Sequence, residues 1–264
     1  IFGVPLGVSA GFVFLFVLFG SLLDKAGAGE YFINLAFSML GKYRGGSAKA
    51  SIIASGFMGI MSGSSIANTV TTGTFTIPLM KRTGFRAEQA AAVEVSASSN
   101  GQLMPPVMGA AAFIMAEFLG MAYTDVVNAA FIPAFVAYFG LFYIIHLEAL
   151  KLGLKGMDDE DIPPKWKTFI QGIHYLIPIM FLLYTLVVLR ESAASAAFNA
   201  IMLLMVLMVV QHPFRAILAK EKLTRDIWLS GFVDILAGMI SGAKNMVPIA
   251  IATALAGIIV GSIT

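Results

Sequence analysis

The sequence predicts an all-α protein that crosses a membrane several times. Its 264 residues are 58% hydrophobic and 12% charged, with a mean hydropathy of +0.87. Soluble domains have about 25% charged residues. Several apolar runs reach the ~20 residues that a helix needs to cross a bilayer. Other apolar runs are interrupted near their middle by glycine and small polar residues, which predicts a re-entrant hairpin and a broken helix.

The composition excludes some classes of function. The net charge is +2 and the basic residues form no clustered surface, so nucleic-acid binding is not supported. The absence of cysteine excludes disulfides and thiolate metal sites. The chain opens on Ile1 and closes on Thr264 inside apolar runs. We therefore expect a fragment of a longer polypeptide, for which no signal peptide can be claimed.

A re-entrant hairpin is predicted over Ser51–Thr83. Its limbs, Ser51–Met61 and Val70–Met80, are only about half as long as a spanning helix at ~1.5 Å per residue. Glycine and small polar residues lie between the limbs, at 62–69. The alternative interpretation is a tight turn between two short buried helices.

The centre of this hairpin is a candidate ion site. Non-helical backbone at membrane depth must be buried in protein or line a watery cavity. Two half-helices that meet at a break offer carbonyl groups to a cation and amide groups to an anion. Side-chain oxygens of Ser64, Ser65, Asn68 and Thr69 are hard ligands that suit a small alkali cation.

A broken helix is predicted over Arg86–Gly120. A good helix former, AEQAAAVEVSA, runs into Ser98–Gln102 and then into Pro105-Pro106, before an apolar segment resumes. A proline pair inside a helix removes backbone donors and clashes with the preceding turn. Unlike the hairpin limbs, the two limbs of this helix together are long enough to cross the membrane.

Five whole spans complete the predicted architecture: Phe2–Leu23, Val126–Leu150, Phe169–Leu189, Ala196–Val210 and Met246–Ile263. Glu30–Tyr43 and Ile227–Ile240 are predicted as interfacial helices, and His212–Arg225 as a polar connector. The resulting segments are 1–50 (first span and arm helix), 51–83 (hairpin), 84–121 (broken helix), 122–226 (scaffold spans and cytoplasmic loops) and 227–264 (interfacial helix and the first span of a second repeat).

The lysines and arginines orient these segments. Threading places almost all of them on one side, which the positive-inside rule makes cytoplasmic. The first and last spans then run in opposite directions. Both have an early proline and a late Phe-Gly or Val-Gly pair, as expected for an inverted repeat whose second copy is incomplete here. Chance matching of apolar sequence is the alternative explanation.

Three motifs carry a resemblance to a known family. They are GSSIANT at 63–69, FTIPLMKR at 75–82 and ASSNGQLMPPVMG at 97–109. With these motifs in this order, the chain resembles the large membrane subunit of the tripartite ATP-independent periplasmic (TRAP) transporters. It is most similar to the fused-permease branch, whose binding proteins are called TAXI. The resemblance is densest from Arg44 to Gly120.

The resemblance implies a Na⁺-driven importer of small organic anions, usually carboxylates. The substrate comes from an extracytoplasmic binding protein, and a small membrane subunit, separate or fused, is a further partner. Na⁺ is the coupling ion and no other cofactor is implied. The implied location is the bacterial or archaeal inner membrane. The implied fold is an inverted-repeat elevator, with Ser51–Gly120 in the mobile block and a second hairpin beyond Thr264.

Site residues follow from the resemblance position by position. The Na⁺ candidates are Ser64, Ser65, Asn68, Ser98, Ser99 and Gly101. The substrate-binding candidates are Asn68, Thr69, Asn100 and Gln102. Asn100 departs from the family pattern, which usually has glycine there, so its side chain could narrow the pocket or add a ligand.

Glu94 is the acid we single out. An ionisable residue within a membrane segment is a functional hypothesis by default, and Glu94 could act in coupling or as a structural hydrogen-bonding group, the latter being favoured. Glu88 instead lies in a first helical turn, where its charge complements the helix dipole. His146, His174 and His212 lie at predicted membrane borders, where interfacial roles are favoured over metal binding.

Other functions remain to be compared with a transporter of this kind. A stand-alone Na⁺-coupled carboxylate symporter of related architecture, working without a binding protein, is the strongest alternative. An ion channel could use a re-entrant loop as its filter, but the second broken helix would then have no role. An intramembrane hydrolase is disfavoured because the serines have no deep histidine or lysine beside them.

Overall fold

The computed structural model describes residues 7–218 and 225–263, and the regular secondary structure within them is entirely helical. The chain divides into two compact units. One, the hairpin unit, comprises Gly29–Gly109 and Val127–Ile173. The other, the long-helix unit, comprises Ile1–Ala28, Ala110–Val126 and His174–Thr264. The predicted class, an all-α polytopic membrane protein, is confirmed.

Four helical segments in the described part of the chain are long and apolar enough to cross a membrane: Tyr123–Lys151, Asp159–Val188, Ala193–Phe214 and Ile227–Ile259. Ser9–Lys25 and Ala28–Leu40 pass the same criterion only when taken as a pair. The predicted first span begins at Phe2, so its start lies outside the described residues. Its described part is helical up to Lys25.

The long-helix unit is built around close packing of α2 (Phe14–Lys25) on α12 (Arg225–Ile263). A Cβ atom on Gly238 would lie 3.1 Å from the Leu22 Cα, and a Cβ atom on Gly242 would lie 3.2 Å from the Leu18 Cα. Two small residues four apart let helix backbones approach in this way. The unit also contains η1 (Ser9–Val13), α7 (Ala110–Leu119), α10 (Leu176–Leu183), η4 (Tyr184–Val188) and α11 (Ala193–Leu218).

Two predicted boundaries in this unit are wrong. The interfacial helix at Ile227–Ile240 and the span from Met246 belong to one continuous helix, α12, of 39 residues, about 58 Å long at 1.5 Å per residue. The polar residues before Met246 do not end the helix, and the Asn245 side chain donates to Ser21 Oγ at 3.1 Å. Helix α11 likewise continues through the start of the predicted connector to Leu218, and 219–224 lie outside the described residues.

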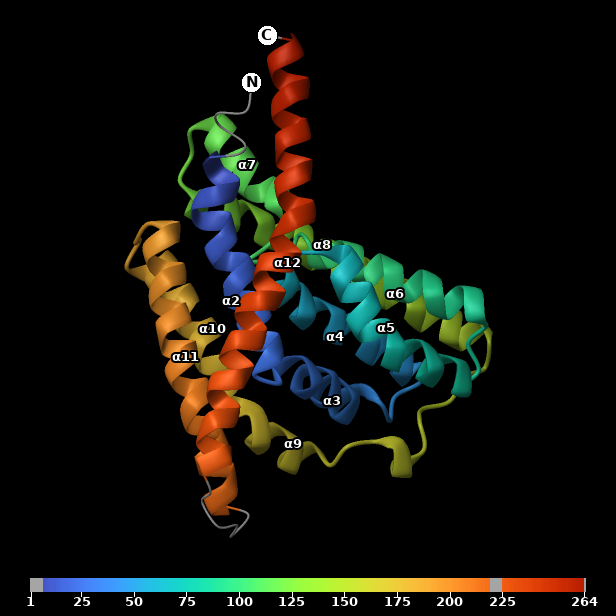
Figure 1. Ribbon diagram of the computed structural model, residues 1–264. Helices are drawn as coiled ribbons and strands as arrows, with labels where there is room; N and C mark the ends of the chain where they lie inside the picture. Colours follow the sequence, from blue (N-terminus) through green and yellow to red (C-terminus); the bar gives the residue numbers. More distant parts are fainter. Residues whose placement is uncertain (1–6, 219–224, 264) are drawn as a thin grey trace. The chain divides into compact units, whose positions relative to one another are not determined.

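The hairpin unit contains the elements that the sequence motifs occupy. These are α3 (Ala28–Leu40), α4 (Gly46–Ser62), α5 (Ser65–Arg82), α6 (Ala87–Gly101), α8 (Tyr123–Lys151), η2 (Asp159–Asp161) and α9 (Lys165–Gly172). Helices α4 and α5 form the predicted hairpin, and α6 packs along both of them (Figure 1).

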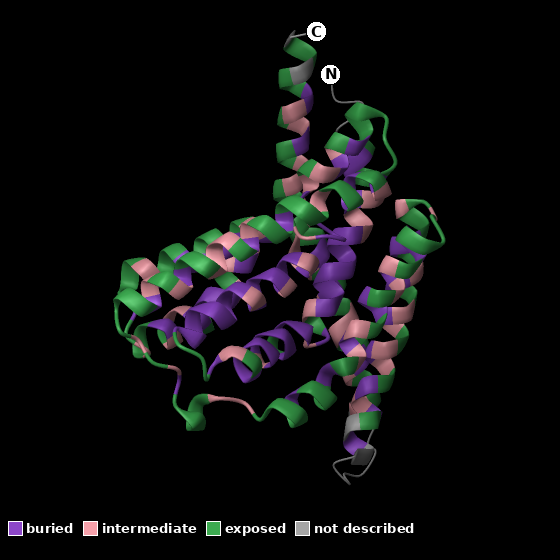
Figure 2. Cartoon of the chain, turned by 180° about the vertical axis from the view of Figure 1, so that it is seen from behind, coloured by how far each residue is buried: buried purple, intermediate pink, exposed green. Residues whose placement is uncertain are grey.

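Helix α4 lies at the centre of the hairpin unit and is buried along nearly its whole length (Figure 2). One side contributes Ala50 and Ala54 to a cluster with Phe37 of α3. Another side contributes Ala48 and Ile52 to a cluster with α5, α6 and α8. Glycine, alanine and serine dominate α4, and such small residues allow neighbouring helices to approach closely.

The predicted broken helix is present as two helices. Helix α6 ends at Gly101, and α7 begins at Ala110 after a non-helical stretch at 102–109. The boundary between the two compact units lies within the predicted segment Arg86–Gly120. Residues up to Gly109 belong to the hairpin unit, and residues from Ala110 belong to the long-helix unit. The hairpin unit also includes α8, which was predicted as part of the scaffold.

Candidate cation and substrate site

The tip of the hairpin is a two-residue break with a defined cap on each side. Gly63 follows α4 with a φ of +56°, a left-handed conformation in which glycine ends many helices. Ser64 precedes α5, and its Oγ accepts a hydrogen bond from the Ala67 N–H at 3.3 Å, as an N-cap residue does. The C-terminal carbonyls of α4 and the N-terminal amides of α5 therefore lie at the same tip, offering both ends of a helix dipole.

The end of α6 packs directly against this hairpin. A Cβ atom on Gly59 would lie 2.5 Å from the Gly101 Cα, and a Cβ on Gly63 would lie 2.4 Å from the Met108 carbonyl oxygen. Backbone thus lies against backbone, with no room for side chains. The predicted proximity of the hairpin tip and the helix break is confirmed.

Side chains also connect the break to the tip. Gln102 follows α6 and donates from Nε2 to the Ser65 Oγ at 3.0 Å. Ser65 is the first residue of α5. Gly101 also lies close to the tip, because a Cβ atom on Gly101 would lie 3.0 Å from Asn68 Nδ2. The two predicted motifs therefore form one region of the hairpin unit.

The Asn68 side chain is buried and hydrogen-bonded within this region. It is fully buried, and its Nδ2 donates to the Ser55 carbonyl at 2.9 Å. Thr72 lies one turn later on α5, and its Oγ1 is 2.8 Å from the main-chain carbonyl oxygen of Asn68 and 3.5 Å from Asn68 Oδ1. Burial without hydrogen bonds is costly for an amide, and here the amide nitrogen is satisfied by α4.

The remaining predicted site residues differ in their surroundings. Thr69 and Asn100 are partly buried, whereas Gln102 and Ser99 are exposed. Ser98 is fully buried and donates to Glu94, one turn earlier on α6, at 3.3 Å. Successive residues of a helix point in different directions, so the structure turns Ser98 towards the interior and leaves Ser99 on the exposed surface.

Glu94 is the centre of a buried hydroxyl cluster. Its side chain is fully buried, and its carboxylate accepts hydrogen bonds from four hydroxyl groups on three helices. The donors are Ser55 of α4 at 3.1 Å, Thr72 of α5, Thr76 of α5 at 2.5 Å and Ser98 of α6 at 3.3 Å. None of the ion pairs among the described residues involves Glu94. The hydrogen-bonded environment that the sequence favoured for this acid is present.

Sequence reasoning missed the partners of Glu94. Ser55, Thr72 and Thr76 were not among the predicted site residues. A signal was nevertheless available, because Thr72 and Thr76 follow Asn68 at intervals of four residues. Polar residues at this spacing lie on one face of a helix, and a polar face on an otherwise apolar hairpin requires hydrogen-bonding partners.

The comparison with known families decides which family this architecture represents. The model of the family described as the tripartite ATP-independent periplasmic transporter, DctM component, matches residues 5–264. The chain belongs to the DctM family. The predicted resemblance to the large TRAP permease subunit is thereby confirmed, and an enzymatic function is excluded by this membership.

Individual relatives agree with this assignment. The chain is 35% and 36% identical over 91 residues to proteins from Rhodobacter capsulatus and Vibrio cholerae, each described as a C4-dicarboxylate TRAP transporter large permease protein. These matches cover 34% of this chain and 21% and 20% of the relatives. A 2,3-diketo-L-gulonate TRAP transporter large permease protein from Escherichia coli is 23% identical over 70% of this chain and 44% of its own length.

A buried lysine forms a second polar group in the hairpin unit. Lys49 of α4 is 5% exposed, and its Nζ lies 3.0 Å from His146 Nδ1 and 5.4 Å from the centre of the Phe142 ring. A buried cation is stabilised by a hydrogen-bond acceptor and by the face of an aromatic ring. His146 connects α8 to the hairpin through this contact, and its interfacial role stays a prediction.

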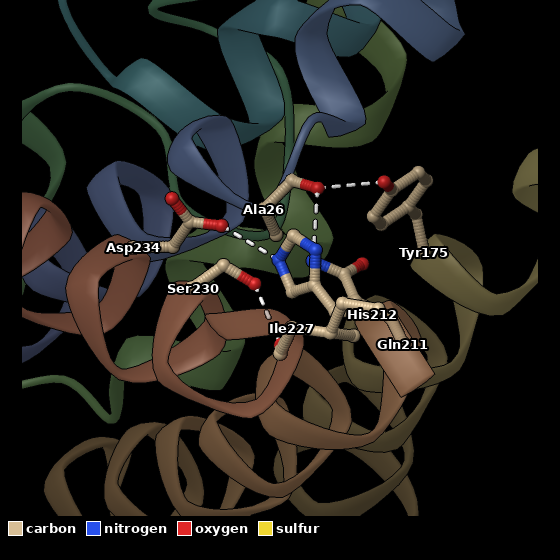
Figure 3. Close-up of polar contacts among 7 residues, drawn as sticks. All are labelled: Ala26, Tyr175, Gln211, His212, Ile227, Ser230 and Asp234. Carbon is tan, nitrogen blue, oxygen red and sulfur yellow. Dashed lines mark hydrogen bonds and ion pairs between the residues drawn. The ribbon is translucent and has the colours of Figure 1, made fainter. Parts of the chain in front are cut away.

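A third polar group lies in the long-helix unit (Figure 3). His212 of α11 contacts Asp234 of α12, with 2.8 Å between Nε2 and Oδ2. Nearby, Tyr175 Oη and Gln211 Nε2 donate to the Ala26 carbonyl at 2.6 and 3.3 Å. This carbonyl follows α2, where backbone acceptors lack partners within the helix. His212 therefore connects two helices, which the sequence did not predict.

Proposed function

We propose that the chain is part of the membrane permease of a Na⁺-coupled importer of small organic anions, in particular carboxylates. In this proposal an extracytoplasmic binding protein delivers the anion to the permease. A small membrane subunit, separate or fused, completes the assembly in a bacterial or archaeal inner membrane. Membership of the DctM family supports this function, as do the dicarboxylate and diketogulonate transporters named among the relatives.

The observation that carries the proposal is the contact between two helix breaks around a buried amide. Asn68 is fully buried where the hairpin meets the end of α6. Irregular backbone within a membrane protein is tolerated where it is buried in protein or lines a water-filled cavity. The C-terminal end of one half-helix favours a cation, and the N-terminal end of another favours an anion.

We assign roles to the site residues on this basis. Na⁺ is held by oxygen atoms around the tip and the break, from Ser64, Ser65, Asn68, Ser98 and Gly101. Ser99 is the weakest of the predicted ligands, because its side chain is exposed on α6. The carboxylate of the substrate is held by the N-terminal end of α5 with Asn68, Thr69, Asn100 and Gln102. In the elevator mechanism, the hairpin unit carries these groups across the membrane.

Uptake into proteoliposomes tests this function. The complete permease is reconstituted with its small subunit, and uptake of a radiolabelled C4-dicarboxylate is measured with and without the binding protein, in an inward Na⁺ gradient or an equal K⁺ gradient. We expect uptake only when both Na⁺ and the binding protein are present. Because the carried anion is unidentified, the same assay is run with a panel of small carboxylates.

Each departure from this result identifies a different error. Na⁺-dependent uptake without a binding protein would support the stand-alone symporter. Uptake that is equal in Na⁺ and K⁺ would contradict sodium coupling. Unselective, rapid ion flux without carboxylate uptake would support a channel.

A further inference from the structure

Two residues that contact Glu94 also hold Asn68. The Ser55 hydroxyl donates to Glu94 Oε1 at 3.1 Å, while the Ser55 carbonyl accepts from Asn68 Nδ2 at 2.9 Å. The Thr72 Oγ1, which carries a single proton, lies within hydrogen-bonding distance of Glu94 Oε1, of the main-chain carbonyl oxygen of Asn68 at 2.8 Å and of Asn68 Oδ1 at 3.5 Å. Two short paths, one through each limb of the hairpin, therefore lead from the acid to Asn68. The path through Ser55 reaches the amide nitrogen, and the path through Thr72 reaches the main-chain carbonyl and, at 3.5 Å, the amide oxygen.

The other two partners of Glu94 have no such connection. Thr76 donates to Glu94 Oε2 at 2.5 Å, and Ser98 donates to Oε1 at 3.3 Å. No hydrogen bond that joins Thr76 or Ser98 to Asn68 is found among the described residues. Thr72 and Thr76 are both fully buried on α5 and both donate to the same carboxylate. They differ in that only Thr72 also contacts Asn68.

We propose that Glu94 is a positioning residue for the cation site. Through Ser55 and Thr72 it fixes the side chain of Asn68, so that the amide nitrogen stays on α4 and the amide oxygen is presented to Na⁺. The proposal rests on the function proposed above. A carboxyl group is suited to this role because its two oxygen atoms accept several hydrogen bonds at once.

A purely structural role for Glu94 makes a different prediction. If the carboxylate only stabilised the packing of three helices, loss of any one of its hydroxyl partners would lower the stability of the permease. The Na⁺ affinity would then be unchanged, or it would fall by a similar factor whichever hydroxyl is lost. If the carboxylate positions Asn68, loss of Thr72 must weaken Na⁺ binding more than loss of Thr76. The two threonines therefore form a matched pair for a test.

The test compares Thr72→Val with Thr76→Val, which each remove one hydroxyl and keep the shape of the side chain. Uptake by the complete permease with its binding protein is measured against Na⁺ concentration. We expect Thr72→Val to raise the half-saturating Na⁺ concentration about tenfold, the effect of about one hydrogen bond, with the maximal rate retained. Thr76→Val should stay within about twofold of the parent. Thr72→Ser, which restores the hydroxyl, should restore the Na⁺ affinity.

The acid itself is tested by Glu94→Gln alone and together with Thr72→Val. Because Thr72 acts on a path that starts at Glu94, we expect the double variant to show no larger shift in half-saturating Na⁺ than Glu94→Gln alone. Glu88→Gln, an exposed acid on the same helix, is the control and should behave like the parent. Additive shifts in the double variant would contradict a shared path.

The outcomes separate this inference from the proposed function. If the parent permease shows no dependence on Na⁺, the proposed function fails. If the parent depends on Na⁺ but Thr72→Val and Thr76→Val shift its affinity equally, or neither does, the positioning role is wrong and the proposed function stands.

Discussion

At the scale of single residues, glycines bring the two predicted motifs together. Gly59 on α4 and Gly101 on α6 lie opposite each other, and a Cβ on Gly59 would lie 2.5 Å from the Gly101 Cα and 2.7 Å from its carbonyl oxygen. Neither neighbouring atom is the flexible end of a side chain. The approach of α6 to the hairpin tip therefore depends on the absence of a side chain at Gly59.

We expect Gly59→Ala to destabilise the permease. The added methyl group would force α4 and α6 apart, and overpacking of this kind typically costs about 1–3 kcal/mol. The melting temperature of the purified permease in detergent should fall by several degrees. Gly140→Ala is the matched control, because Gly140 lies inside α8 with nothing within 4 Å of its Cβ position.

The control should be neutral or slightly stabilising, since alanine is favoured over glycine by up to ~1 kcal/mol within a helix. Equal melting temperatures for the two variants would mean that the Gly59–Gly101 contact is not tight in the folded protein.

The sequence located the polar site residues but not their partners. Asn68 and Gly101 were predicted from the two motifs, and the structure places them together. The hydroxyl groups around Glu94 were missed, because nothing in a single sequence states which faces of α4, α5 and α6 pack against each other. For the same reason Ser98 and Ser99 were predicted as equivalent, whereas only Ser98 is buried.

At the scale of elements, the hairpin depends on the conformation of its break. Gly63 has a left-handed backbone, and a Cβ there would lie 2.4 Å from the Met108 carbonyl oxygen. The non-helical stretch after α6 therefore packs over the tip. A side chain at this position would change both the turn and this contact.

We expect Gly63→Ala to be more harmful than Gly120→Ala. Both glycines have positive φ, +56° and +62°, so alanine loses about 1 kcal/mol at each through backbone strain. Only at Gly63 does the new Cβ also meet another atom, since nothing lies within 4 Å at Gly120.

Carboxylate uptake at a fixed Na⁺ concentration and thermal stability are the measurements for this pair. Gly63→Ala should lose most uptake and several degrees of melting temperature, and Gly120→Ala only a few degrees. Similar losses for both variants would show that backbone strain alone accounts for the effect.

The contact between His212 and Asp234 supports a further prediction about α11 and α12. The two side chains are 26% and 33% exposed, so the contact should contribute about 1 kcal/mol, as partly exposed pairs do. Asp234→Ala should lower the free energy of unfolding by this amount. Asp234→Asn keeps an acceptor oxygen for the histidine and should lose less, as thermal or denaturant unfolding would show; an equal loss would mean that charge rather than the hydrogen bond stabilises the contact.

The sequence predicted elements well where their boundaries are set locally. Glycine, serine and proline lie near the ends of α4, α5 and α6, because these residues act through backbone geometry and capping. The predicted starts of the two hairpin limbs are nevertheless wrong, since α4 begins at Gly46 rather than Ser51 and α5 begins at Ser65 rather than Val70. The end of α11 and the continuity of α12 were predicted wrongly. In α12 the polar residues at Lys244 and Asn245 indicated a boundary, but the hydrogen bond from Asn245 to Ser21 is a tertiary contact that sequence patterns do not contain.

At the scale of the whole molecule, two interrupted helical segments of a DctM-family chain meet around Asn68. We propose that this meeting point binds the sodium ion that drives import. Fold class and family were predictable from the sequence, because apolar runs of spanning length and the three ordered motifs are visible in it. The division into two compact units was not predictable, since it follows from which helices pack together.

Equilibrium binding of radioactive Na⁺ to the purified complete permease tests this claim most directly, because it needs neither the substrate nor the binding protein. The variants are Asn68→Ala and, as an exposed control, Glu88→Gln. We predict saturable Na⁺ binding in the parent and in Glu88→Gln, and at least tenfold weaker binding in Asn68→Ala, the loss expected for about one ligand bond. Binding of Na⁺ by Asn68→Ala with the affinity of the parent would contradict the claim.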